Sequence, residues 1–202
     1  GFTATVADKA SVEADDSVTL DGSKIGAGAL TATAKTGDLS VKEADIKATT
    51  GGITLTAEAA DIDASSATLT AKDEVKLTAN QSITAEDASV EAASLAMTAN
   101  TGSVEATGFT ATVAGQALVE AGDSVTLDGS KLGLGALTAS AKSGDLSLKS
   151  AEVDISGAAE LTAKQSITAT EASVEAASLA MTAETGSVEA SGLTATVADQ
   201  AS

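Results

Sequence analysis

Apolar and polar residues alternate in short segments along the whole chain. Val18 and Leu20 form one apolar pair, and Leu39 and Val41 form another, each separated by one polar residue. A period of two is that of a β-strand with one buried face, because successive strand side chains point to opposite faces. Gly, Asp, Ser and Asn cluster between the segments, as at Asp21-Gly22, and these residues favour turns. The pattern predicts an all-β fold of short strands without helices.

Two long segments of the chain occur twice, at two different offsets in the numbering. Residues 1–42 recur as residues 108–149, with 33 of 42 positions identical. Residues 81–108 recur as residues 165–192, with 24 of 28 positions identical. The second offset is the shorter one, because one block of sequence between the repeated segments is present in the first copy and missing from the second. A stacked solenoid can lose one layer and close up, whereas a globular core seldom tolerates such a loss between matched flanks.

The spacing of the strand segments predicts the size of one coil. About fifteen strand intervals fit into the first offset and about twelve into the second, so each strand with its turn takes roughly seven residues. Both numbers of strand intervals are multiples of three, which favours three strands per coil. In a two-sided coil, fifteen intervals, an odd number, would place the second copy of a segment on the opposite side. We therefore predict a three-sided, single-chain parallel β-helix (β-solenoid) of about 21 residues per coil, right-handed by the general crossover preference and about 45 Å long.

The same repeats predict the domain organisation. We expect residues 1–202 to form one continuous β-solenoid with an internal duplication of 1–107 and 108–191. Residues 192–202 (GLTATVADQAS) then start a further repeat, because they match residues 1–11 (GFTATVADKAS). Neither terminal segment has the pattern of a cap over an open strand edge. We expect a longer array, or copies that join head to tail into a fibre.

The alternation assigns one face of each segment to the interior. Glu13, Lys42, Lys76 and Glu91 are predicted to face solvent. The residues predicted to face inward, together with their copies, are Val12, Val18, Leu20, Leu39, Val41, Ile53, Leu55, Ile62, Leu69, Val75, Leu77, Ile83, Val90, Leu95, Met97 and Val104.

The composition fits a long and narrow core. Hydrophobic residues make up 43% of the chain, mostly Ala, Val, Leu and Ile, and Pro, which cannot donate to a parallel ladder, is absent. The two aromatic residues, Phe2 and Phe109, are equivalent positions, and Leu193 begins the same segment a third time. We expect these three side chains to stack inward at equivalent places. Disorder is the alternative that the acidic composition suggests, but the regular apolar pattern argues against it.

Charge and residue types narrow the function. The net charge of −18 disfavours binding to nucleic acid or anionic membrane, which need Lys or Arg to neutralise phosphate. No apolar run approaches the roughly 20 residues that span a bilayer, so no membrane insertion is expected. The chain has no His and no Cys, the usual general base and thiolate nucleophile. We therefore expect a protein that is not an enzyme.

Two aspartate pairs are weak candidates for Ca²⁺. The sequence DSVTLDGS occurs twice and places Asp16 and Asp21, and again Asp123 and Asp128, beside turns. Oxygen ligands suit Ca²⁺, although the loop patterns of EF-hands and calcium-binding β-rolls are absent. The alternative is that Asp-Gly only makes a corner. We expect no cofactor other than weakly bound Ca²⁺.

Threonines two positions apart are a further surface pattern, similar to the arrays of ice-binding solenoids. A lattice-matched face needs one unbroken column, whereas at the predicted coil length these pairs fall on more than one side. The pairs are Thr3/Thr5, Thr31/Thr33, Thr54/Thr56, Thr68/Thr70 and Thr110/Thr112.

The strand cadence and the Thr-, Ala-, Lys- and Asp-rich sequence of residues 53–85 resemble two kinds of bacterial β-helix. One is the needle-like repeat region of type VI secretion spike proteins, and the other is the shaft of filamentous-haemagglutinin-like adhesins. The resemblance implies a structural repeat protein that forms the shaft of an extracellular filament or surface appendage. The alternatives are an adhesin stalk, a secretion or phage spike needle, and a minor one, an ice-binding solenoid.

Overall fold

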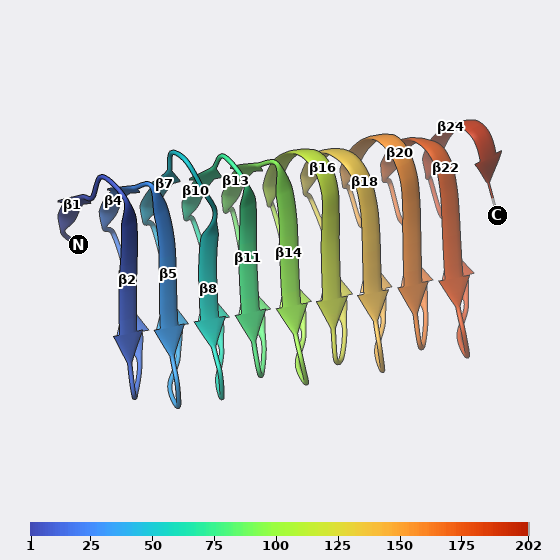
Figure 1. The fold of residues 1–202 in the computed structure, drawn as a ribbon. Coiled ribbons are helices and arrows are strands. Elements are labelled where there is room, and N and C mark those ends of the chain that lie inside the picture. Colours follow the sequence, from blue (N-terminus) through green and yellow to red (C-terminus); the bar gives the residue numbers. More distant parts are fainter. Residues whose placement is uncertain (202) are drawn as a thin grey trace.

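The protein is a rod in which the chain winds around one long axis, as the computed structural model shows for residues 1–201, with side chains for residues 1–198. The two ends of the chain lie at opposite ends of the rod (Figure 1). Within the described residues there are strands and turns but no helix, and thus no helix long and apolar enough to cross a membrane.

Each coil contributes three strand segments, and equivalent segments of successive coils pair in parallel as three ladders. The first ladder begins with β1 (Thr3–Thr5), β4 (Lys24–Ala27), β7 (Asp45–Ala48), β10 (Thr68–Ala71) and β13 (Ser89–Ala92). The second ladder begins with β2 (Lys9–Ala14), β5 (Ala29–Ala34), β8 (Ile53–Ala57), β11 (Glu74–Ala79) and β14 (Ser94–Ala99). These second-ladder strands lie at the front of Figure 1.

In the later coils the first and second ladders share long strands, which bend where the pairing register shifts. These strands are β16 (Thr110–Ala121), β18 (Lys131–Ala141), β20 (Glu152–Ala163), β22 (Ser173–Ala183) and β24 (Thr194–Ala201). The third ladder is made of very short strands: β3 (Val18–Thr19), β6 (Leu39–Ser40), β9 (Ile62–Asp63), β12 (Ile83–Thr84), β15 (Val104–Glu105), β17 (Val125–Thr126), β19 (Leu146–Ser147), β21 (Ile167–Thr168) and β23 (Val188–Glu189).

The pairing register gives the length of each coil. Along the first ladder each residue pairs with the residue 21 positions later, except that Asp45 pairs with Thr68, 23 positions later. Thr3 and Thr110 are therefore five coils apart, and Thr110 and Thr194 are four. The block that the second copy lacks has the length of this one longer coil.

The interior is lined by the apolar side of all three ladders. Of the sixteen residues predicted to face inward, fifteen are buried, and Val12, in the first coil, is half-buried. Among their copies, Met181 is half-buried, and Val188 is exposed, contrary to the prediction. The four charged residues predicted to face solvent are all exposed. The sequence did not suggest a second feature of the core, a column of alanines at the end of the second ladder. This column pairs one alanine with the next in every coil and comprises Ala14, Ala34, Ala57, Ala79, Ala99, Ala121, Ala141, Ala163 and Ala183.

One corner of every coil has a left-handed backbone. The residue with positive φ follows the third ladder by three positions and recurs once per coil. Four of these residues are glycine and five are not, although left-handed φ costs an L-residue about 1–2 kcal/mol. They are Gly22, Glu43, Ser66, Asp87, Gly108, Gly129, Ser150, Glu171 and Gly192.

These observations confirm the predicted all-β parallel β-solenoid with about nine turns, and they confirm its repeat of about 21 residues per coil. Three strand ladders are compatible with three sides. The three-sided cross-section and the right-handed winding stay predictions.

Candidate functional site

The exposed large apolar side chains of the described residues all lie in the end coils of the rod. Phe2 is 49% exposed and Val6 is 37% exposed, both beside β1 in the first coil. Val188, in β23, is 43% exposed at the other end. Elsewhere along the rod the equivalent residues are buried by a coil on either side. Among the described residues, exposed large apolar side chains are thus confined to the two end coils.

The three residues predicted to stack inward differ in burial. Phe109 is 1% exposed, Leu193 is half-buried against the core, and Phe2 is half-exposed instead of packed inward. They share one inward column, and only Phe109 has a complete coil on both sides. Its column neighbours are Ala88 and Ser130, and these small side chains leave room for the ring.

The Asp-Gly corners use their carboxylates to join successive coils. Asp21 Oδ1 accepts a hydrogen bond from Ser40 Oγ at 2.5 Å and one from the Lys42 backbone N–H at 2.9 Å. In the second copy, Asp128 Oδ1 accepts the same two bonds, from Ser147 at 2.6 Å and Lys149 at 2.8 Å. These contacts favour the corner role that the sequence left open beside Ca²⁺.

The structure does not bring the four candidate aspartates together. Within each pair, one aspartate (Asp16 or Asp123) lies in the turn before the third ladder and the other (Asp21 or Asp128) lies after it. Five coils separate the pair of the first copy from the pair of the second. In the part of the chain that the structure describes, no three Asp or Glu side chains are close enough to hold a metal ion together. Calcium binding at these residues stays a prediction.

A seam of serine and aspartate side chains, which sequence reasoning missed, runs along the rod beside the third ladder. Each side chain but the last accepts a hydrogen bond from the backbone N–H of the equivalent residue one coil further on, at 2.6–3.4 Å, and the last residue, Ser187, takes part as an N–H donor. The available signal was a Ser or Asp immediately before each inward residue of the third ladder. The seam comprises Asp38, Asp61, Ser82, Ser103, Ser124, Asp145, Ser166 and Ser187.

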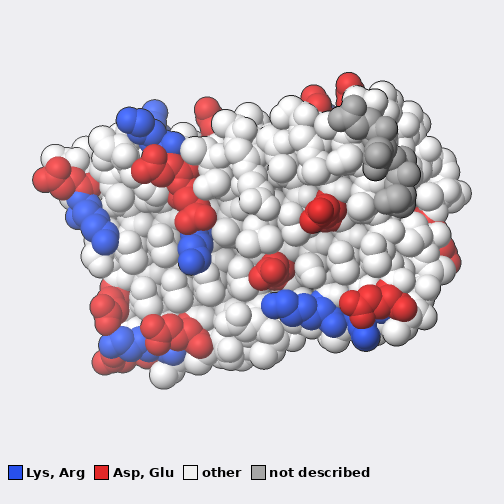
Figure 2. All heavy atoms as spheres, turned by 45° about the vertical axis from the view of Figure 1, so that its right-hand side comes forward, with Lys and Arg blue, Asp and Glu red and all other residues white. Residues whose placement is uncertain are grey.

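Charged side chains lie singly or as ion pairs on the sides of the rod, and large areas of the face in Figure 2 carry no charge. Lys35 Nζ lies 2.8 Å from Asp15 and 2.9 Å from Glu13, and hydrogen bonds to these two carboxylates raise its pKa. Lys42 Nζ lies 2.7 Å from Asp63. Burial raises the pKa of Asp63, but hydrogen bonds from Lys42 and Ser65 more than offset this effect, so the pKa lies below its ordinary value.

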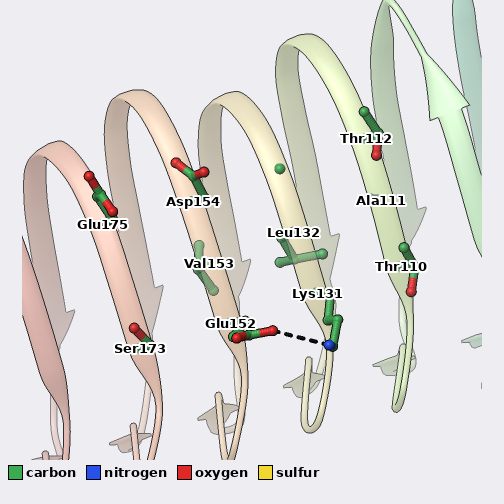
Figure 3. Close-up of a pocket in the computed structure, with 11 residues that line it drawn as sticks. Thr110, Ala111, Thr112, Lys131, Leu132, Glu152, Val153, Asp154, Ser173 and Glu175 are labelled. Carbon is green, nitrogen blue, oxygen red and sulfur yellow. Dashed lines mark ion pairs between the residues drawn. The ribbon is translucent and has the colours of Figure 1, made fainter.

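A shallow hollow of about 420 Å³ lies on the outer side of the first ladder, where Gly133 has no side chain (Figure 3). Lys131 of β18 and Glu152 of β20 form an ion pair at 3.3 Å on one side of the hollow. Asp154, also of β20, and Glu175 of β22 contribute two further carboxylates to its lining. The equivalent hollow over Gly26 in the first copy is lined by Lys24, Asp45 and Lys47, so that Lys47 takes the place of Asp154. The two hollows thus share a position and differ in charge.

The Thr-x-Thr pairs lie on two ladders and skip coils, as their spacing predicts. Two pairs belong to the second ladder and three to the first. The structure adds one outward column in which Thr33, Thr56, Thr78 and Thr98 follow one another in successive coils. Glu120 comes next in register and interrupts the column.

Comparisons with known proteins leave these observations to stand alone. No protein-family model matches the chain, and neither a curated protein nor a solved structure matches it.

Proposed function

We propose that this chain is a structural, non-enzymatic β-solenoid that forms the shaft of an extracellular filament or surface appendage by joining head to tail. One observation carries the proposal: the exposed large apolar residues of the described chain, Phe2, Val6 and Val188, lie in the two end coils. The sides of the rod are polar, and the net charge of −18 opposes side-to-side contact. Association therefore buries apolar area at the ends.

Parallel strand pairing gives this association its geometry. An end coil offers a row of backbone donors and acceptors that can pair with a further strand. The location outside the cell is proposed from the resemblance to bacterial shaft proteins. An adhesin stalk or a spike needle is the alternative, and it would use the same rod with a partner at its tip.

Light scattering and electron microscopy over a range of protein concentrations test the proposal. We expect filaments whose length grows with concentration, whereas a spike needle would give a defined trimer. The substitution Val188→Lys should prevent growth because it places a charge on an end face that the joint buries. Thr112→Lys, which adds one charge to an exposed site on the side of the rod, is the matched control and should leave growth unchanged. A monomer at every concentration would contradict the proposal.

Salt and Ca²⁺ should affect the same filaments. Screening weakens the repulsion between acidic rods, so bundles should increase with ionic strength. Ca²⁺ bound at Asp16, Asp21, Asp123 or Asp128 would promote bundling below the concentration that screening alone requires. Calorimetric titration with Ca²⁺, compared between the parent and Asp16→Asn/Asp123→Asn, tests that minor part of the proposal.

The threonine column supports ice binding as a second candidate function. Four threonines in one column repeat at the spacing of parallel strands, about 4.8 Å, and the hydroxyl of one of them, Thr78, is buried without a hydrogen-bond partner. Measurement of the gap between melting and freezing temperatures tests this function. Thr78→Lys should abolish such a gap, and Thr112→Lys, outside the column, should not.

A further inference from the structure

The boundary between the two internal copies shows what a joint between two chains would look like. Residues 81–107 precede this boundary, and residues 165–191, at the far end of the rod, repeat them closely. Residues 108–149 follow the boundary, and residues 1–42, at the near end, repeat them. The surfaces that face each other at the internal boundary therefore recur as the two end faces.

At the internal boundary a single TATV strand fits between its neighbours. Residues 110–113 of β16 pair with β13 on one side, Ser89 with Thr110, and with β18 on the other, Thr110 with Lys131. Phe109, Ala111 and Val113 are then all buried, at 1–2% exposure.

Each end of the rod holds half of this arrangement with its own TATV strand. At the far end β24 pairs with β22, Ser173 with Thr194, as β16 does with β13. At the near end β1 pairs with β4, Thr3 with Lys24, as β16 does with β18. At a joint between two copies, β24 of one copy and β1 of the next are therefore both available for the single position that residues 110–113 of β16 fill inside the chain.

We propose that, in the head-to-tail joint of the proposed function, β24 of one copy replaces β1 of the next copy and pairs with its β4. Gln200 and Ala201, at the end of β24, pair with Ser178 and Leu179 and occupy the places of Lys9 and Ala10 of the second copy, so these two residues leave with β1. The rest of β2 of the second copy then meets the second-ladder part of β22, and β3 meets β23. These contacts repeat the pairings of β14 with β16 and of β15 with β17 inside the chain. They would cover Val188 and the half-buried Val12 and Met181.

The strand that leaves is weakly held. Three residues of β1 pair with β4, and its flanking apolar residues Phe2 and Val6 are already half-exposed. If both strands stayed, β1 would stack on β24, and β2 and β3 would be one layer away from β22 and β23. The exchange therefore keeps all three ladders continuous at the joint.

Disulfide cross-linking of the full chain distinguishes the two joints, because the native chain has no cysteine. Neighbouring parallel strands are about 4.8 Å apart, within the Cα separation of about 4.4–6.8 Å that a disulfide spans. Thr194→Cys with Lys24→Cys should give covalent dimers and longer oligomers on oxidation. Within one chain these two positions are eight coils apart, so every cross-link is between copies. Thr194→Cys with Asp45→Cys, one coil beyond reach, is the control and should give none.

A second variant lacks residues 1–10 and with them β1 and the first two residues of β2, whose places β24 takes. Exchange predicts that this variant polymerises at a several-fold lower concentration, because no strand has to leave. Filaments that are lost on this deletion, and that cross-link through Thr194→Cys with Thr3→Cys but not with Lys24→Cys, would overturn strand exchange alone. Absence of any polymer from the parent chain would instead overturn the head-to-tail function itself.

Discussion

Residues 1–42 and 108–149 have nearly the same sequence and differ in burial. Phe109 is 1% exposed and Phe2 is 49% exposed; Val113 is buried and Val6 is not. Equivalent residues of both segments pair in the same register, so the difference comes from the coils on either side. In a solenoid the inward direction of a side chain is local, whereas its burial depends on the coil before it and the coil after it.

The two segments also differ in strand continuity. In the first copy β4 and β5 are separate strands, and in the second copy the same region is the single strand β18. Ala27, the last inward residue before the bend, is replaced by Leu134, and both side chains are buried. The larger side chain fills the interior beside the bend, where β18 continues through a register shift. Register is thus common to both copies, whereas the shape of the bend is not.

Deletions should give the largest effect, since the second copy differs from the first by one coil. Removal of residues 45–67 takes out the one longer coil completely and joins Ala44 to Thr68 in phase. We expect a single unfolding transition close to that of the parent, because only one interface between coils is lost. Removal of residues 46–56 leaves a coil too short to close, so the rod should split into two halves with separate transitions. Circular dichroism during denaturation distinguishes these outcomes, and equal curves would contradict the modular coil.

The comparison of the two phenylalanines predicts the next largest effect. Phe109→Ala should destabilise the protein by about 3–5 kcal/mol, because it opens a cavity in a complete coil. Phe2→Ala should cost less than about 1 kcal/mol, because its ring is half in solvent already. Urea unfolding measures both, and similar losses for the two variants would show that Phe2 is covered in solution.

The left-handed corner predicts changes of intermediate size. Gly129 has φ +66° and free space around its Cα, so Gly129→Ala should cost about 1–2 kcal/mol through the backbone alone. Glu43→Gly should relieve the same strain and stabilise the protein by up to about 1 kcal/mol, less the entropy that glycine adds to the unfolded chain. Gly133→Ala is the control, because its φ is ordinary and its added methyl meets no close atom. A loss at Gly133 as large as that at Gly129 would mean that space, not φ, decides.

An ion pair present in one copy alone predicts the smallest effect. Lys42 pairs with Asp63, whereas in the second copy the register places Thr168, opposite Ser147, at the position that Asp63 takes opposite Ser40. Since folding lowers the pKa of Asp63, its stabilising effect is present above the ordinary value near 3.9 and is lost as pH falls through the folded pKa. Asp63→Thr should therefore cost less than about 1 kcal/mol at pH 7 and less still at pH 2. Thermal melts at both pH values test this, and an equal loss at pH 2 would assign the effect to packing.

The coil could be predicted from the sequence for two reasons. The numbers of strand intervals within the two repeat offsets are both multiples of three, and the alternation of apolar and polar residues marks the inward positions. It does not carry the left-handed corner, since Glu43, Ser66 and Glu171 occupy positions that the fold imposes on residues with no preference for them. Phe2 could not be distinguished from Phe109 because burial is set by neighbouring coils. Handedness leaves the alternation unchanged, so no pattern of inward residues reports it.

The seam of serines and aspartates has a mechanical consequence. Its hydrogen bonds run parallel to the axis, so a pull on the two ends of the rod stretches them directly. Bonds to the carboxylates of Asp61 and Asp145 are 2.6 and 2.7 Å long, whereas the bond to Asp38 is 3.2 Å and those to serine hydroxyls are 3.2–3.4 Å. Charged acceptors make the shorter and stronger bonds. The three successive bonds between Ser82 and Asp145 all have serine acceptors. Under tension we therefore expect the rod to extend first in this stretch, near its middle, while the coils on either side stay stiff.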